Sequence, residues 1–157
     1  MLKIMFVCTG NICRSAMADA YLKYLLKRFG VEDKIQVVSC GIDADSGEKA
    51  TKYAIKAIAE YGANLEKHRA RNIKEFDLKQ FDKILVMTIE HQRRVCEIEP
   101  EVVHKVELLK RYMKLNESRY MNIDDPWGLS LEVYRYCAAE IVNCVDNLVN
   151  ELIEKGG

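Results

Sequence analysis

Apolar residues along this 157-residue chain follow two alternating patterns, short continuous runs and longer runs at helical spacing. A short apolar run between turn formers is typical of a buried strand, and apolar positions that repeat every three to four residues are typical of a helix. The short runs predict strands over residues 2–7, 34–39, 83–87 and 104–108. The longer runs predict helices over residues 15–29, 48–61 and 88–99, and a last helix that begins near Ser130.

Strands that alternate with helices indicate an α/β fold, a parallel sheet with helices on both faces. The sequence contains no internal repeat and no linker-like segment, so we expect residues 1–157 to form a single domain. In such sheets, ligands bind beyond the carboxyl ends of the strands, where the winding direction reverses. The turn between residues 7 and 15 leads directly from a strand into a helix, and we expect the chemistry of the protein there.

Charge and composition narrow the classes of partner. The chain has 24 Lys and Arg against 24 Asp and Glu, and its formal net charge is zero. This balance gives no bulk field that would attract nucleic acid or an anionic membrane surface, so we expect neither as a partner. No apolar stretch approaches the roughly 20 residues that a membrane-spanning helix needs. Nothing in the composition indicates an oligomeric state.

Six cysteines are spread over the whole chain, mostly within apolar segments: Cys8, Cys13, Cys40, Cys96, Cys137 and Cys144. A small secreted scaffold would instead space its cysteines through turn-rich sequence. The apolar run at the start is short, contains Lys3 and does not resemble a secretion signal. We therefore predict a cytoplasmic protein with free thiols.

The turn after the first strand carries the candidate chemistry and reads Val7-Cys8-Thr9-Gly10-Asn11-Ile12-Cys13-Arg14-Ser15. A loop that curls into the start of a helix aims backbone N–H groups inward and forms a nest for a tetrahedral oxyanion. Arg14 would close this nest with a two-pronged contact to two phosphate oxygens. The same positive field favours the thiolate form of Cys8. A thiolate beneath a bound phosphate indicates attack on phosphorus and a phosphocysteine intermediate.

Other interpretations of the same residues stay open on spacing alone. Cys8 and Cys13 are also compatible with small buried apolar residues at a tight turn. A metal site is less favoured, because this pair supplies only two ligands and no Cys/His pair follows at zinc-like spacing. A cysteine–histidine protease gains no support from the surroundings of His68, His91 or His104. We therefore expect neither a metal nor a cofactor.

The segment from Val7 to Ser15 resembles the signature of the low-molecular-weight protein tyrosine phosphatases almost residue for residue. Asp125-Pro126, which precedes the long last helix, is similar to the acid loop of that family, and further similar segments are Ser39-Cys40-Gly41 and His68-Arg69-Ala70-Arg71. The resemblance covers essentially the whole chain. It implies a four-stranded parallel sheet with a phosphate-binding loop after the first strand. It also implies hydrolysis of protein phosphotyrosine or small aryl phosphates, and binding of inorganic phosphate and similar oxyanions.

The resemblance further implies roles in catalysis. Cys8 would be the nucleophile, Arg14 would hold the phosphoryl group, and Asp125 would be the general acid and then the base. The other members of the phosphate-binding loop would be Thr9, Gly10, Asn11, Ile12, Cys13 and Ser15.

Supporting roles follow from the same resemblance. Ser15 would donate a hydrogen bond to the Cys8 sulfur. Asn11, hydrogen-bonded with Ser39 and His68, would hold the loop in its unusual backbone shape. Cys13 would be the redox partner that forms a reversible disulfide with Cys8 under oxidation.

Several positions depart from the family pattern. Residues 42–47 lack the aromatic residue that commonly lines one side of the cleft, and Thr88 stands where many members have an acidic residue. Trp127-Gly128 stands where animal members carry paired tyrosines. Trp127 is an aromatic residue in a polar loop, so we expect it either to wall the pocket or to pack in the core. These departures leave the substrate preference open.

Three other functions share this pattern in part. An arsenate reductase of the same fold needs two further cysteines, and Cys96 has no second cysteine near it in the sequence. Protein arginine phosphatases tend to have Thr where this chain has Ile12, which favours phosphotyrosine as the substrate here. A non-enzymatic phosphate-binding module would need neither Cys8 as a nucleophile nor Asp125 as an acid.

Overall fold

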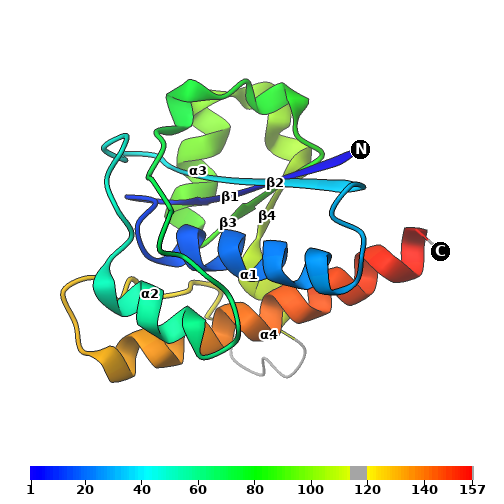
Figure 1. The fold of residues 1–157 in the computed structure, drawn as a ribbon. Coiled ribbons are helices and arrows are strands. Elements are labelled where there is room, and N and C mark those ends of the chain that lie inside the picture. Colours follow the sequence, from blue (N-terminus) through cyan, green and yellow to red (C-terminus); the bar gives the residue numbers. More distant parts are fainter. Residues whose placement is uncertain (114–119, 157) are drawn as a thin grey trace.

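A computed structural model of the protein describes residues 1–113 and 120–156 (Figure 1). Its centre is one sheet of four parallel strands in the order β2-β1-β3-β4. The strands are β1 (Leu2–Cys8), β2 (Ile35–Gly41), β3 (Lys83–Val86) and β4 (Val106–Leu108). The predicted α/β fold is therefore confirmed, with strands close to the expected positions.

Helices cover both faces of the sheet, as Figure 1 shows. The helices are α1 (Arg14–Arg28), α2 (Lys52–Ala59), α3 (Ile89–Ile98) and α4 (Leu131–Gly156). Because successive side chains of a strand point to opposite faces, Ile4 and Phe6 of β1 pack toward α1, α2 and α4. Met5 and Val7 pack in a second core that includes Val95 of α3. The burial of β1 from both sides explains its continuous apolar run.

Two predicted boundaries are wrong for identifiable reasons. The second helix begins at Lys52 rather than residue 48, because the chain before it is extended: the Ala70 N–H donates to the Glu48 carbonyl over 2.7 Å. Thr51 then caps α2 by accepting the Ala54 N–H. The fourth strand begins at Val106 rather than residue 104, because Pro100–Lys105 forms a 3-10 helix.

The strand order makes β1 the point where the winding direction reverses, with β2 on one side and β3 on the other. At the carboxyl end of β3, the Met87 N–H donates to the Val7 carbonyl over 3.2 Å, and the Met87 carbonyl accepts the Ile123 N–H over 2.9 Å. The loop that precedes α4 is thereby fixed beside the end of β1. This is the place where open α/β sheets bind their ligands.

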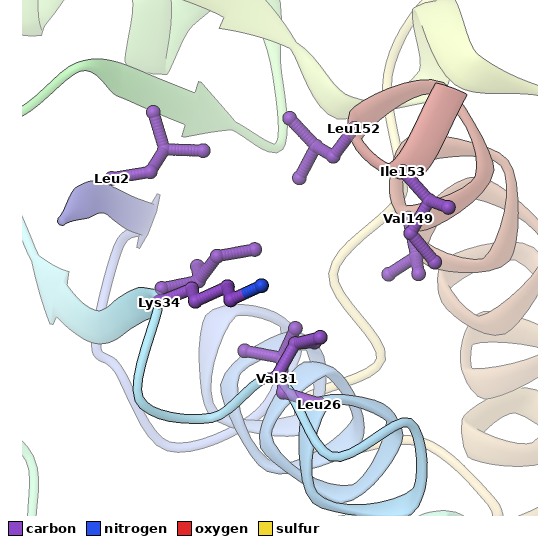
Figure 2. Close-up of a pocket in the computed structure, with 8 residues that line it drawn as sticks. Leu2, Leu26, Val31, Lys34, Val149, Leu152 and Ile153 are labelled. Carbon is purple, nitrogen blue, oxygen red and sulfur yellow. The ribbon is translucent and has the colours of Figure 1, made fainter. Parts of the chain in front are cut away.

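An apolar cavity of about 340 Å³ lies at the opposite, amino end of the strands (Figure 2). Its lining combines the starts of β1 and β2 with α1, α4 and the turn after α1: Leu2, Leu26, Val31, Lys34, Ile35, Val149, Leu152 and Ile153.

Among the described residues, no helix is long and apolar enough to cross a bilayer. All six cysteines are free, as the sequence predicts.

Candidate active site

The loop between β1 and α1 is shaped by Asn11. Its φ of 57° lies in the left-handed region, which asparagine tolerates better than most residues. The fully buried Asn11 side chain donates to Ser15 Oγ over 2.9 Å and accepts the Arg71 N–H over 2.9 Å. Its carbonyl accepts a hydrogen bond from His68 Nε2 over 2.6 Å. These three contacts hold the strained residue in place.

The Cys8 sulfur lies buried inside this loop and receives hydrogen bonds. The Asn11 N–H donates to it over 3.3 Å, and Ser15 Oγ lies 2.8 Å away. Since Ser15 Oγ accepts from the Asn11 side chain, its own proton is free to point to the sulfur, which is nearer than the Cys40 carbonyl at 3.4 Å. Both hydrogen-bond donors thus point to the sulfur of the predicted nucleophile.

The amino end of α1 opens onto the same loop. Its N-cap residue, Cys13, makes no side-chain capping bond, and the first turn contains no acidic residue. Within the described part of the chain, the N–H groups of Gly10, Ile12 and Arg14 donate to no backbone carbonyl. The loop amides and the positive end of the helix are therefore available to an anion.

Arg14 reaches across the site from the first residue of α1. The residue is only 4% exposed, and its Nη1 donates to the Ile123 carbonyl over 2.9 Å. Its Nη2 lies 3.6 Å from Asp125 Oδ2. Its Nε is buried and has no hydrogen-bond partner among the described residues. A buried N–H of this kind is rarely left unpaired, and an oxyanion in the site would satisfy it.

These groups surround one cavity of about 200 Å³, whose lining is Cys8, Thr9, Gly10, Ile12, Cys13, Arg14, Asp125 and Trp127. Asp125 stands at the rim, with its side chain 51% exposed, and accepts the Trp127 N–H over 3.1 Å. Trp127 is 64% exposed, so it lies at the mouth of the cavity rather than in the core. The structure thus brings the three predicted catalytic residues to one place.

The loop that carries Asp125 is held by a buried ion pair. Lys110 Nζ lies 3.0 Å from a carboxylate oxygen of Glu140 and donates to the Asn122 carbonyl over 3.2 Å. The Asn122 side chain accepts the N–H of Ile89, the first residue of α3. Because breaking a buried pair leaves an uncompensated charge, this arrangement fixes the loop firmly.

The second thiol of the loop, Cys13, lies beside two hydroxyl groups. Its sulfur is 3.3 Å from Tyr134 Oη and 3.5 Å from Thr51 Oγ1. Burial raises the pKa of the Cys13 thiol above its ordinary value, although the two hydroxyl contacts act in the opposite direction. Cys13 is therefore held as the thiol, and its redox role stays a prediction.

The predicted hydrogen bond between Asn11 and Ser39 is wrong. Ser39 Oγ instead donates to Asp19 Oδ2 over 2.7 Å, and both residues are buried. The side chain and carbonyl of Asn11 instead bond to Ser15, Arg71 and His68, and of these only the contact with His68 was predicted. Ser39 therefore supports α1 rather than the loop.

His91 contacts the loop between β1 and α1, although its sequence surroundings gave it no distinction. It is buried, and its Nε2 lies 2.8 Å from Thr9 Oγ1. Its place near the loop follows only from the topology. His91 is in the first turn of α3, which follows β3, and β3 pairs with β1. Among the described residues, no group of three His, Cys, Asp or Glu side chains is placed to hold a metal ion.

Comparisons of the sequence and of the structure with known proteins point to the same family. The model of the low molecular weight phosphotyrosine protein phosphatase family matches residues 3–156. The chain is 32% identical over 154 residues to the protein-arginine-phosphatase of Geobacillus stearothermophilus, covering 96% of this chain and 95% of that protein. It is 37% identical over 131 residues to the low molecular weight protein-tyrosine-phosphatase Wzb of Escherichia coli K12, covering 83% and 82%. The crystal structure of a low molecular weight protein tyrosine phosphatase from T. tengcongensis superposes with a TM-score of 0.86 at 33% identity, covering 96% and 99%.

Proposed function

Since this chain belongs to the low molecular weight phosphotyrosine protein phosphatase family, we propose that it hydrolyses protein phosphotyrosine through a phosphocysteine at Cys8. The observation that carries the mechanism is the meeting of the Cys8 sulfur, the Arg14 guanidinium and the Asp125 carboxyl around one cavity. A phosphate-binding module would need the loop amides and Arg14 but not a cysteine sulfur with two hydrogen-bond partners, Ser15 Oγ and the Asn11 N–H.

In the first step, the Cys8 thiolate attacks phosphorus. The new bond joins sulfur to phosphorus, and the bond between phosphorus and the phenolic oxygen breaks. Asp125, protonated at this stage, gives its proton to the leaving oxygen, so phenol rather than phenolate departs. Arg14 and the loop amides bind the equatorial phosphoryl oxygens and stabilise the charge that develops there.

In the second step, the Asp125 carboxylate takes a proton from a water molecule, which attacks the phosphocysteine. The sulfur–phosphorus bond breaks, inorganic phosphate forms, and Cys8 leaves as thiolate. The hydrogen bonds from Ser15 and the Asn11 N–H stabilise this leaving group as they stabilise the nucleophile. Such a proton transfer typically contributes about 10²–10⁴ in rate.

The walls of the cavity favour an aryl phosphate. Ile12 and Trp127 present hydrocarbon and indole surface beside the phosphoryl site. A flat phenol ring packs well on such surface, whereas the N–H groups of a phosphoguanidine would need acceptors there. The 32% identity to a protein-arginine-phosphatase makes phosphoarginine the second candidate substrate. The free thiols suit a reducing compartment, and we place the enzyme in the cytoplasm.

The test is a comparison of peptides that carry phosphotyrosine, phosphoarginine or phosphoserine, assayed with EDTA present. We expect phosphotyrosine to be hydrolysed fastest and EDTA to leave the rate unchanged. Hydrolysis of the phosphoarginine peptide alone would make phosphoarginine the substrate in place of phosphotyrosine. Loss of all activity in EDTA would exclude the metal-independent mechanism through Cys8. No hydrolysis of any peptide, together with tight binding of phosphate, would favour the binding module.

A further inference from the structure

We propose that His91, on α3, positions the phosphate-binding loop through Thr9 and is electrostatically coupled to the oxyanion that the cavity binds. The proposal rests on the proposed function only in taking an oxyanion as the ligand of the Cys8 cavity. His91 does not line that cavity, so it is a positioning residue and not a group that touches substrate.

The ring of His91 holds Thr9, the residue that follows the nucleophile. Its Nε2 lies 2.8 Å from Thr9 Oγ1, while the Thr9 carbonyl accepts the Asp43 N–H over 3.0 Å. The His91 main chain is itself fixed, because its N–H donates to Thr88 Oγ1 at the start of α3. Thr9 is thus held through both its side chain and its main chain. His91 provides the side-chain contact from the first turn of α3.

The other ring nitrogen of His91 is unusual. Nδ1 is buried and has no hydrogen-bond partner among the described residues, and the whole residue is only 5% exposed. A charged imidazolium has two N–H donors, and here only one of them would find an acceptor. Burial, with help from the Arg14 charge, lowers the pKa of His91 to about 4. The ring is therefore uncharged at neutral pH.

The charges around His91 come from three elements. On its own helix, Glu90 raises its pKa and Arg94 lowers it. Across the site, Arg14 of α1 lowers the pKa, whereas Asp125 of the acid loop raises it. A dianion bound to Arg14 offsets the positive charge that opposes protonation of the ring. Binding of the anion therefore raises the pKa of His91, and by reciprocity protonation of His91 strengthens anion binding.

The first test follows the histidine ring resonances by NMR between pH 3 and 8, with and without saturating sulfate, which stays largely dianionic over this range. The His91→Asn variant assigns the resonance. We expect the midpoint of His91 to rise by at least about half a unit with sulfate, while that of His104, in the Pro100–Lys105 turn, stays fixed. An identical midpoint in both conditions would overturn the coupling. Because no turnover is measured, this result is separate from the fate of the proposed function.

The second test measures positioning through kcat and KM with a small aryl phosphate. Removing the hydrogen bond in His91→Leu or Thr9→Val should lower kcat/KM about two- to twelvefold. His91→Gln, which can still reach Thr9, should recover part of the loss. The double variant should be no slower than the slower single variant, because both remove the same contact. Additive losses, with Gln no better than Leu, would show that His91 only fills the core.

Discussion

Two cavities of opposite chemistry lie at the two ends of one strand. β1 begins with Leu2 in the wall of an apolar cavity of about 340 Å³ and ends with Cys8 at a cavity of about 200 Å³. The larger cavity is aliphatic apart from Lys34, whereas the smaller one is lined by two cysteines, a guanidinium and a carboxyl group. Function in this fold follows the groups that meet at a cavity and not its volume.

The helix that follows β1, α1, also connects the two cavities and differs in charge at its two ends. α1 starts at Arg14 beside the small cavity, and Leu26, near its other end, lines the large one. The partial positive charge at the amino end of a helix therefore adds to Arg14 at the anion site. Lys27 and Arg28 in its last turn lie at the partially negative end. Of the two ends of α1, the one that begins at Arg14 is prepared for an oxyanion.

The largest expected effect is that of Arg14→Lys. An ammonium keeps the charge but cannot bond the Ile123 carbonyl and also offer two N–H groups to phosphate oxygens. We expect kcat/KM for phosphotyrosine peptide to fall about 10²–10³-fold. The matched control is Arg28→Lys at the opposite end of α1, which should leave kcat/KM unchanged. Equal effects of the two variants would remove the distinction between the two ends.

Gly41→Ala should disturb the catalytic end through backbone crowding. A Cβ at this position would lie 2.4 Å from the Thr9 carbonyl oxygen and 2.9 Å from the Asn11 nitrogen, and neither main-chain atom can move without the loop. We expect a loss of about 3 kcal/mol in the free energy of unfolding in urea. In Gly10→Ala the nearest atom to the new Cβ is 3.6 Å away, so the loss should be much smaller.

The stability of the protein should depend on pH through His91. Its pKa of about 4 in the folded state lies below the ordinary value of 6.5, so the unfolded chain binds more protons between these values. The contribution to stability is complete above pH 6.5 and is lost as pH falls toward 4. From pH 7 to pH 5 the free energy of unfolding should fall by about 2 kcal/mol more in the wild type than in His91→Asn. Parallel urea curves for both proteins at both pH values would contradict this.

The smallest effect is expected at the apolar end. Val149→Ile adds one methylene group to the wall of the large cavity, where Val149 is 2% exposed. Filling empty apolar space should stabilise the fold by up to about 0.8 kcal/mol and leave kcat/KM unchanged. A change in kcat/KM at this position would show that the two cavities are linked and not independent.

The sequence predicts the elements and the loop motif well, but not the contacts between distant segments. The apolar run of β1 is unambiguous because that strand is buried on both faces, and Gly10 and Asn11 mark the turn that follows it. The partners of Asn11 and Ser39 depend on how β2 and α1 pack, which periodicity does not encode. The Ser39–Asp19 and His91–Thr9 contacts therefore became visible only in the folded chain.

Trapping the intermediate shows whether catalysis passes through a phosphocysteine at Cys8. Asp125→Asn should slow its hydrolysis because no base remains to activate water. The variant is mixed with an aryl phosphate, and the reaction is quenched rapidly. Mass spectrometry of the tryptic peptide over residues 4–14 should then show one added phosphoryl group. Since this peptide also contains Cys13, the same experiment in the Cys13→Ser background assigns the site.

In that background we predict the phosphoryl group on Cys8, and none in a Cys8→Ala control. A phosphocysteine mechanism at Cys8 would be contradicted if the wild type turns over substrate but the trapped variant carries no phosphoryl group on Cys8. A phosphoryl group on another residue would contradict it as well.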